Sequence, residues 1–364
     1  MLQQLDHAAV SSRTRHVLAV PSARRLRHLL AGLAVGITVV GGVSVGLEQA
    51  SGYAPSPAYE GTIFPLASGF RSAIPPGARS DLASGPMVSR VDASGENHIV
   101  NVGLFGQAVY EASPQTPRVR VGVSNAPAWG DNDLLHTTVP IPVDARPSTG
   151  SDSKLVIVDR LARKVYDLWY ARRDSTGWTA GWGGVYAIDG DGLSHNVTYG
   201  AGPDRVPYPH PLTRATGSGI SSLLGLATVD ELARGRIDHA LVFSSRFACG
   251  PADTGPFRFP ATTTDGYDLS SACIPEGTRV QLDPSIDLAS LPGIAPFEVT
   301  VGRALQRYGA YLVDNGGAAV AIVAENPRSA GDRALLLAQG ISDGYNGANH
   351  LPWGRLRILA SDGG

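Results

Sequence analysis

Short runs of alternating or β-branched apolar residues recur along most of the chain after residue 60. The clearest is Arg118–Val123, in which every second side chain is apolar, as in a strand with one solvated face. Similar runs, separated by Gly, Pro, Asn and Asp, occur at 99–104, 155–158, 165–169, 185–188, 240–244, 278–282, 310–313 and 318–324. Runs of this length and punctuation predict β-strands joined by turns. Asp314-Asn315-Gly316-Gly317 lies between the last two runs and has the composition of a hairpin turn.

Helical signals are few. Thr228 and Glu231 have the spacing of a capping box and Gly235 supplies a stop signal, so residues 229–234 are predicted to form a short helix. Apolar residues at helical spacing predict an amphipathic helix over 296–308. Many strands with few helices indicate a mainly β fold. We therefore predict a jelly-roll-like antiparallel β-sandwich with one or two short covering helices.

The N-terminal part has a different pattern. Residues 1–28 hold five arginines and one acid, and residues 29–47 then run for 19 positions without a charge. A basic flank before such a segment is typical of a cleaved signal peptide or an uncleaved membrane anchor, and both interpretations stay open. Residues 48–60, rich in Pro, Ser and Gly, are interpreted as a linker, and residues 61–364 as a single β-sandwich domain. We expect the protein to be exported through the cytoplasmic membrane, to act outside the cell or at its surface, and to meet the membrane only through 29–47.

The net charge restricts the class of binding partner, and the two cysteines predict a disulfide. The chain carries −2 overall, and because five arginines and one aspartate give residues 1–47 a charge of +4, the remainder carries −6. A mildly acidic body without a basic run argues against nucleic acid. Cys249 and Cys273 are the only cysteines, and in an oxidising compartment they are expected to pair. Closing that loop would stabilise the fold by roughly 3 kcal/mol.

Several common catalytic signatures are absent from the sequence. It contains no phosphate-binding glycine-rich loop, no dinucleotide fingerprint and no zinc-binding His-Glu-x-x-His motif. Residues 42–46 match the spelling of a nucleophile elbow, but they lie inside the apolar segment, where no triad can assemble. Calcium is the one cofactor left open, because 189–191 and 131–133 bring acidic oxygens close together. Neither loop has the ligand spacing of an EF-hand, and capped turns explain both equally.

An aromatic cluster marks the middle of the chain. Trp178, Trp182 and Tyr186 lie close in sequence to Trp169 and Tyr170. Because aromatic faces suit the apolar faces of sugar rings, Trp178, Trp182 and Tyr186 are candidate glycan-binding residues. The alternative is that the cluster fills the core. Glycines on both sides of Trp182 would let a ligand approach closely.

His239, Arg214 and Asp314 are the candidate catalytic residues. His239 begins a strand run and could serve as an acid or base, although a histidine on an apolar face is also commonly a hydrogen-bonded core residue. Arg214 would hold an anionic substrate group. Two carboxylates in one cleft, Asp314 among them, would permit glycoside hydrolysis, whereas a pair of tyrosine and histidine with an arginine would suit lyase chemistry. Tyr311, which lies in the run directly before Asp314, is a further candidate substrate-binding residue.

The order of several motifs resembles a group of exported actinobacterial proteins over about residues 55–360. The motifs are Ile237-Asp238-His239-Ala240-Leu241, Pro260-Ala261-Thr262, Ile274-Pro275-Glu276-Gly277, Gln281-Leu282-Asp283-Pro284, Tyr308-Gly309-Ala310-Tyr311, Asp314-Asn315-Gly316-Gly317 and Leu351-Pro352-Trp353. The resemblance implies export and a single domain, and it carries over no catalytic role. Trp182, Ser221, His239 and Asp314 match the pattern, which adds Ser221 to the candidate substrate-binding residues.

These observations suggest a secreted or surface-tethered protein that binds or cleaves a polysaccharide or cell-envelope glycan. If it is catalytic, it would be a glycoside hydrolase or a lyase. The alternative is a non-catalytic structural or interaction protein of the cell envelope. A concave site beside Trp182 that carries polar groups would favour the first hypothesis, and its absence would favour the second.

Overall fold

The computed structural model describes residues 63–93, 95–195, 214–342 and 344–361, and the backbone of 198–199 and 206–207. Residues Ala50–Gly364 form one compact unit. This unit contains all three apolar clusters of the described residues, and a domain with its own hydrophobic core is expected to fold alone. The predicted signal or anchor at 29–47 and the predicted linker at 48–60 lie outside the described residues. Within the part that is described, no helix is long and apolar enough to cross a membrane.

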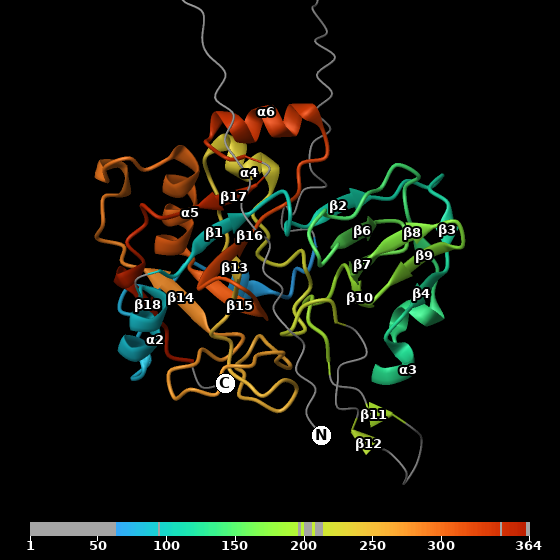
Figure 1. Ribbon diagram of the computed structural model, residues 1–364, viewed down its shortest axis with the longest axis horizontal. Coiled ribbons are helices and arrows are strands. Elements are labelled where there is room, and N and C mark those ends of the chain that lie inside the picture. The colour runs from blue at the N-terminus through green and yellow to red at the C-terminus, as the bar shows by residue number, and fades with distance from the viewer. Residues whose placement is uncertain are drawn as a thin grey trace, which may run out of the picture. The chain divides into compact units, whose positions relative to one another are not determined.

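The larger of the two main sheets has seven strands and mixes parallel with antiparallel pairs (Figure 1). In spatial order the strands are β17 (Tyr345–Gly347), β1 (His98–Asn101), β16 (Val320–Val323), β13 (Leu241–Ser245), β15 (Ala310–Asn315), β14 (Arg279–Leu282) and β18 (Leu356–Ile358). β1 is parallel to β16 and β13 is parallel to β15, whereas the other pairs are antiparallel. β13 lies between β15 and β16, so the predicted hairpin at 314–317 is wrong.

The second main sheet has four strands, and smaller sheets extend it. Its order is β10 (Trp182–Ala187), β7 (Lys164–Trp169), β6 (Leu155–Asp159) and β2 (Ala108–Glu111). β2 is parallel to β6, and the other pairs are antiparallel. The smaller sheets are β4 (Val121–Val123), β9 (Gly177–Ala180) and β8 (Arg172–Asp174), the pair β3 (Arg118–Val119) and β5 (Val139–Pro140), and the pair β11 (Thr198–Tyr199) and β12 (Val206–Pro207).

Alternate side chains of the central strands enter different apolar clusters. In β6, Leu155 and Ile157 join the cluster that also holds Trp178 of β9. Val156 on the opposite face of β6 joins a cluster that also contains Val242 of β13. This middle cluster therefore packs the four-stranded sheet against the seven-stranded sheet. Both faces of the central strands are buried, which is why their sequences form continuous apolar runs.

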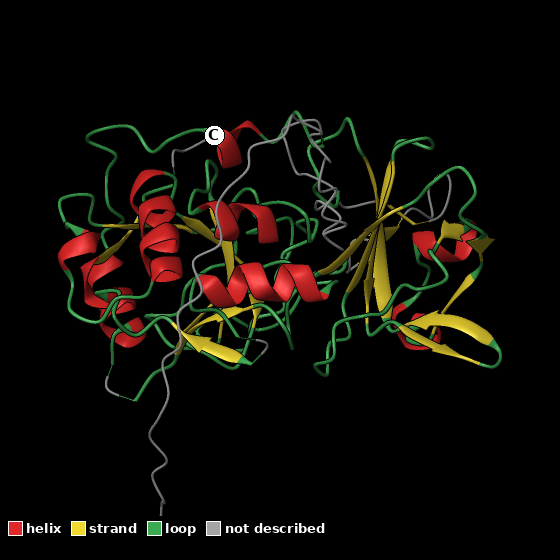
Figure 2. Ribbon diagram, turned by 90° about the horizontal axis from the view of Figure 1, so that it is seen from above, coloured by secondary structure: helices red, strands yellow, loops and turns green. Residues whose placement is uncertain are grey.

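Most of the helices lie around the seven-stranded sheet (Figure 2). Helix α4 (Val229–Arg234) begins at the predicted capping box of Thr228 and Glu231 and ends at Gly235, whose φ is 72°. Helix α5 (Pro296–Arg307) agrees with the second predicted helix and buries its apolar side in the third cluster. The other α-helices are α1 (Ser68–Arg71), α2 (Ser84–Val91), α3 (Ala126–Trp129) and α6 (Ala330–Ala338). Short 3₁₀ turns occur at Asp133–His136, Leu288–Ser290 and Trp353–Arg355.

The prediction of a strand-rich fold is confirmed, and so is the Cys249–Cys273 disulfide. A jelly-roll sandwich is not confirmed, because β1–β16, β13–β15, β2–β6 and β4–β9 are parallel pairs. Parallel neighbours need crossover connections, and α5 lies in the connection from β13 to β15. The need for crossover connections also explains why the fold has more helices than the one or two that the sequence predicted.

Candidate functional site

A pocket of about 190 Å³ collects aromatic and charged side chains from both main sheets. Trp169 and Trp182 come from β7 and β10, and Lys154 directly precedes β6. Asp314 comes from β15, and the loop 214–217 closes one wall. We call this hollow the Lys154 pocket. Its parts are distant in sequence, so it forms only when the two sheets pack together.

Three tryptophans form the aromatic wall of the Lys154 pocket. The rings of Trp129 and Trp169 stack with their centroids 6.2 Å apart, and Trp182 meets Trp129 edge to face at 5.5 Å. Trp169 and Trp182 are direct partners in the β7–β10 ladder, and Trp129 ends α3. Trp129 is 39% exposed, whereas Trp182 is buried. The wall therefore offers an open ring face on a rigid support, which is the arrangement needed to stack on a ligand.

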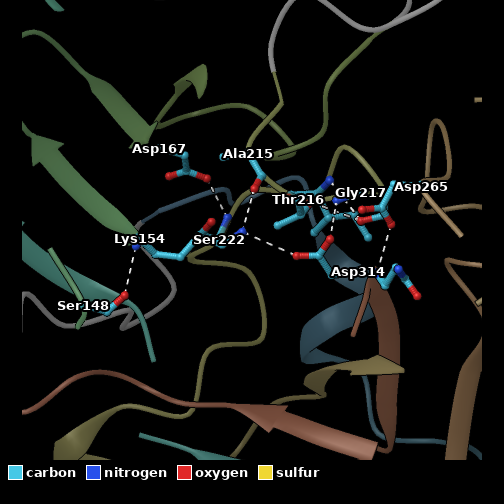
Figure 3. A network of polar contacts seen from close by, with 12 residues as sticks. Ser148, Lys154, Asp167, Ala215, Thr216, Gly217, Ser222, Asp265 and Asp314 are labelled. Carbon is cyan, nitrogen blue, oxygen red and sulfur yellow. Dashed lines mark hydrogen bonds and ion pairs between the residues drawn. The ribbon is translucent and has the colours of Figure 1, made fainter. Parts of the chain in front are cut away.

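Lys154 is buried beneath this wall, and its ammonium group points toward Asp314 (Figure 3). Nζ donates to the carbonyl oxygen of Ala215 at 2.8 Å and lies 3.4 Å from Oδ2 of Asp314. Burial lowers the pKa of Lys154, but the carboxylates of Asp314 and Asp152 outweigh burial and raise the pKa above its ordinary value. The pocket therefore contains a permanent positive charge that is held by a carbonyl and a carboxyl group.

Asp314 is the titratable group of the pocket. Its Oδ1 accepts the backbone N–H of Gly217 at 2.9 Å. Burial, with the nearby Asp265 and Asp152, raises the pKa of Asp314 to about 7, and Lys154 opposes this rise. Asp314 therefore keeps its proton up to a higher pH than an ordinary aspartate does. A carboxyl group in this state can donate a proton to a bound substrate.

Asp265 supplies a second carboxyl group on the same side of the pocket (Figure 3). Its Oδ1 accepts the backbone N–H of Asn315 at 2.9 Å. The Gly217 backbone lies directly against this carboxyl group, because a Cβ at Gly217 would be 2.1 Å from Oδ1. Gly217 thus contacts both acids, donating its N–H to Asp314 and leaving space for Asp265.

Arg214 lines the pocket, but its charge is already matched. Its Nη1 lies 3.1 Å from Oδ1 of Asp253 and donates to Oγ1 of Thr263 at 3.3 Å. Asp253, Thr263 and Asp265 all belong to the loop that the Cys249–Cys273 disulfide closes. The disulfide therefore restrains the loop that holds Arg214 and carries the second carboxyl group.

Asp167 of β7 lies outside the Lys154 pocket and holds the loop at Ser221 and Ser222 in place. The side chain is fully buried, and Oδ2 accepts the backbone N–H of Ser222 at 2.6 Å and the hydroxyl of Ser221 at 3.0 Å. Burial raises the pKa of Asp167 to about 6, against the stabilising donors of Ser222 and Ser221. Ser221 is thus placed in a buried contact with Asp167, and it does not line the pocket.

The structure brings together Trp182, Arg214 and Asp314 among the predicted site residues, and it places His239 elsewhere. His239 is buried with Nε2 3.2 Å from Oε1 of Glu231, and its Nδ1 donates to the carbonyl oxygen of Ala240 at 2.9 Å. Desolvation lowers the pKa of His239, but the Glu231 carboxylate outweighs it and raises the pKa. This geometry fits the alternative interpretation of His239 as a hydrogen-bonded core residue.

The remaining predicted residues lie outside the Lys154 pocket. Trp178 is buried in the cluster on the outer face of the four-stranded sheet. Tyr186 is buried in the middle cluster, with its hydroxyl 3.4 Å from Oγ of Ser194, and burial raises its pKa well above the ordinary value. Tyr311 packs at 4.6 Å against Phe70. Trp178 and Tyr186 thus fit the core alternative that the aromatic cluster left open.

Sequence reasoning missed Lys154, Asp152, Asp265 and Trp129. Lys154 had a usable signal, because Lys154 and Lys164 are the only lysines among 30 basic residues. The other lysine, Lys164, is exposed, so this signal reduces the choice to two positions without showing which of them is buried. Asp265 and Trp129 sit in loop and short-helix segments without any distinguishing pattern.

The two loops considered for calcium are occupied by other contacts. Asp189 pairs with Arg163 at 2.9 Å, and Asp131 contacts His136 at 2.6 Å. In the described part of the chain, no cluster of three or more His, Cys, Asp or Glu side chains has the arrangement of a metal site.

Comparisons of the chain with protein-family models, with curated proteins and with solved structures found no match.

Proposed function

We propose that the Lys154 pocket binds a sugar residue of a glycan and that Asp314 and Asp265 hydrolyse the adjoining glycosidic bond. The observation that carries the proposal is the meeting of a tryptophan wall with two carboxyl groups, one of which has a raised pKa. Glycoside hydrolysis needs this combination of a stacking surface, a proton donor and a second carboxylate.

The size of the pocket supports a single sugar residue as the bound group. Sites that enclose drug-sized ligands measure roughly 300–1,000 Å³. At about 190 Å³, the Lys154 pocket is smaller than that range and suits one ring. The exposed face of Trp129 beside it can carry a neighbouring residue of the same chain, as expected for a polymer that extends past the site.

In the proposed reaction, the proton of Asp314 moves to the glycosidic oxygen as the bond from that oxygen to the anomeric carbon breaks. Asp265 takes a proton from the water that attacks the anomeric carbon, or it attacks that carbon itself and water then releases the sugar. The separation of the two carboxyl groups decides between these routes. Lys154 stays charged, donates to Ala215 and stabilises the Asp314 carboxylate that remains after proton transfer.

The charges of the pocket favour a neutral sugar or an amino sugar over a uronic acid. Arg214 is matched by Asp253, and Lys154 is matched by Asp314. Asp152 and Asp265 then leave the lining negative, and an anionic polymer would be repelled. The sequence-based role of Arg214 as an anion holder is replaced here by a structural role, in which it ties the disulfide-closed loop to the pocket.

The test uses the unit Ala50–Gly364 and a panel of neutral, amino-sugar and uronic-acid polysaccharides. We expect retention on a neutral or amino-sugar member and release of oligosaccharides from it. Asp314→Asn should lower the release rate by at least about a hundredfold, because it removes the proton donor. Retention of this variant on the same polysaccharide checks that it still folds without the ion pair to Lys154. Trp129→Ala should weaken binding by about tenfold, because it removes the open stacking face.

Two outcomes would decide against the proposal. In the first, the protein is retained on a polysaccharide but releases no oligosaccharide from it, and Asp314→Asn does not change this result. The protein would then have no catalytic step, and the non-catalytic cell-envelope alternative would be supported. In the second, the protein is retained on no polysaccharide of the panel, and a glycan would no longer be the proposed ligand. Asp174→Asn serves as the matched control, because Asp174 is an exposed aspartate of β8 outside the pocket.

A further inference from the structure

A second hollow, of about 490 Å³, shares no lining residue with the Lys154 pocket. Arg79, Arg258 and Arg279 line it, and no acidic residue does. We call it the arginine groove. Tyr311 of β15 lines part of it, so one of the residues expected to bind substrate lies here instead.

The arginine groove keeps an excess of positive charge. Arg258 pairs with Asp81 at 2.7 Å. Arg279 donates to the carbonyl oxygens of Tyr308 and Ser72. Arg79 is exposed and makes no side-chain hydrogen bond or ion pair with the described residues. The residues that line the groove include three arginines and no acid, so the groove is complementary to an anion.

Large apolar side chains stand beside these arginines. Phe259 is 84% exposed and Phe257 is 42% exposed, and both line the groove. They belong to the loop closed by the Cys249–Cys273 disulfide, which appears in gold and orange below β13 and β15 in Figure 1. Aromatic rings next to arginines are typical of surfaces that lie in the headgroup region of a membrane.

We propose that the arginine groove docks the domain on the surface of a bilayer that contains anionic lipids. The phosphates of the lipids meet Arg79 and Arg279, and Phe259 enters the boundary between headgroups and acyl chains. We choose a membrane as the partner of this groove because the sequence predicts a signal peptide or membrane anchor at 29–47. If it stays as an anchor, the 15 residues from 48 to 62 extend at most about 50 Å, which keeps the groove within reach of the same bilayer. This proposal does not depend on the glycan function.

The test measures co-flotation of the unit Ala50–Gly364 with vesicles of phosphatidylcholine alone and of phosphatidylcholine mixed with phosphatidylglycerol. This unit lacks residues 29–47, so any binding comes from the folded domain. We expect binding to the mixed vesicles only, and weaker binding at higher salt. Arg79→Gln should weaken it about fivefold, as expected for one arginine near an anionic surface. Phe259→Ser should weaken binding at low and high salt alike.

Matched controls come from the other main sheet and its extensions. Arg120→Gln removes an exposed arginine that follows β3, and Leu161→Ser removes a side chain that is 79% exposed in the β6–β7 turn. Both should leave vesicle binding unchanged. Equal binding to the two kinds of vesicle, or no binding to either, would overturn the proposal. So would a dimer in solution that Phe259→Ser dissociates, because a second copy would then be the occupant.

Discussion

The ammonium group of Lys154 lies 3.4 Å from Oδ2 of Asp314 and joins the two main sheets through a buried ion pair. Lys154 directly precedes β6 of the four-stranded sheet, and Asp314 lies near the end of β15 in the seven-stranded sheet. The lysine side chain is only 5% exposed, so water cannot replace the carboxylate if the partner is lost. One contact thus supports both the packing of the sheets and the protonation of Asp314.

Lys154→Met should therefore destabilise the domain strongly. Removing one member of a buried pair leaves the other uncompensated and costs about 3 kcal/mol of unfolding free energy. Urea unfolding followed by tryptophan fluorescence measures this loss. Lys164→Met is the matched control, because Lys164 is exposed at the start of β7 and its loss should cost under about 0.5 kcal/mol. Equal urea midpoints for the two variants would contradict a structural role for the pair.

The same variant should change the titration of Asp314. Lys154 lowers the pKa of this buried carboxyl group, so its removal should raise the pKa above the present value of about 7. Carboxyl titration by ¹³C NMR measures the shift directly, and Asp314→Asn assigns the signal. A pKa that is unchanged in Lys154→Met would show that the ammonium group does not control the protonation of Asp314.

Much of the local structure was predictable because it depends on neighbouring residues. The capping box of Thr228 and Glu231 and the stop at Gly235 specify α4 without any tertiary contact. The order of strands was not predictable in this way. Asp314 and Asn315 have the composition of a turn, yet they extend β15, because β13 occupies the position where a hairpin partner would pair.

The candidate site was predictable only in part, for a related reason. Trp182 and Asp314 could be chosen by residue type, but their meeting depends on the packing of two sheets. Asp265 reaches the pocket from a loop whose position is set by a disulfide and by the absence of a Cβ at Gly217. Neither restraint leaves a periodic pattern in the sequence. Sequence spacing therefore identified candidates without showing which of them share a pocket.

Gly217→Ala tests whether the close approach of the backbone to Asp265 sets the site. The new Cβ would lie 2.1 Å from Oδ1 of Asp265, so the loop or the carboxyl group must move. We expect glycan binding or turnover to fall at least about tenfold, because displacements of this size at a catalytic group are costly. Gly85→Ala is the control, since nothing lies within 4 Å of a Cβ there. Equal activity of both variants would show that Asp265 is not held in a required position.

The disulfide should stabilise the loop that carries Asp253 and Asp265 more than it stabilises the rest of the domain. Replacing Cys249 and Cys273 together by Ser frees a loop with a sequence separation of 24, at a cost of roughly 3 kcal/mol. Hydrogen exchange should increase most at residues 250–272 and least in the buried strand β6. A uniform increase across both regions would show that the bond stabilises the domain only globally.

The buried pair of His239 and Glu231 should make stability depend on pH in a defined window. Burial lowers the pKa of His239, but hydrogen bonding to Glu231 outweighs burial and raises it above 6.5, while Arg71 opposes this rise slightly. Burial raises the pKa of Glu231, but the bond to His239 outweighs it and lowers the pKa below 4.5. The histidine contribution is complete below pH 6.5 and is lost as the pH rises through the raised pKa. The glutamate contribution is complete above pH 4.5 and is lost as the pH falls, so the pair stabilises most between these two values.

His239→Gln should therefore reduce the unfolding free energy by about 1.5 kcal/mol at pH 5.5 and by less at pH 8, because the contribution of the histidine declines as the pH rises above 6.5 toward the raised pKa. Chemical unfolding of both proteins across this range gives the difference at each pH. His195→Gln serves as the control, because His195 is largely exposed beside Asp191 and its loss should change stability little at any pH. A difference between His239→Gln and the unaltered protein that stays constant from pH 5.5 to pH 8 would mean that folding does not raise the pKa of His239.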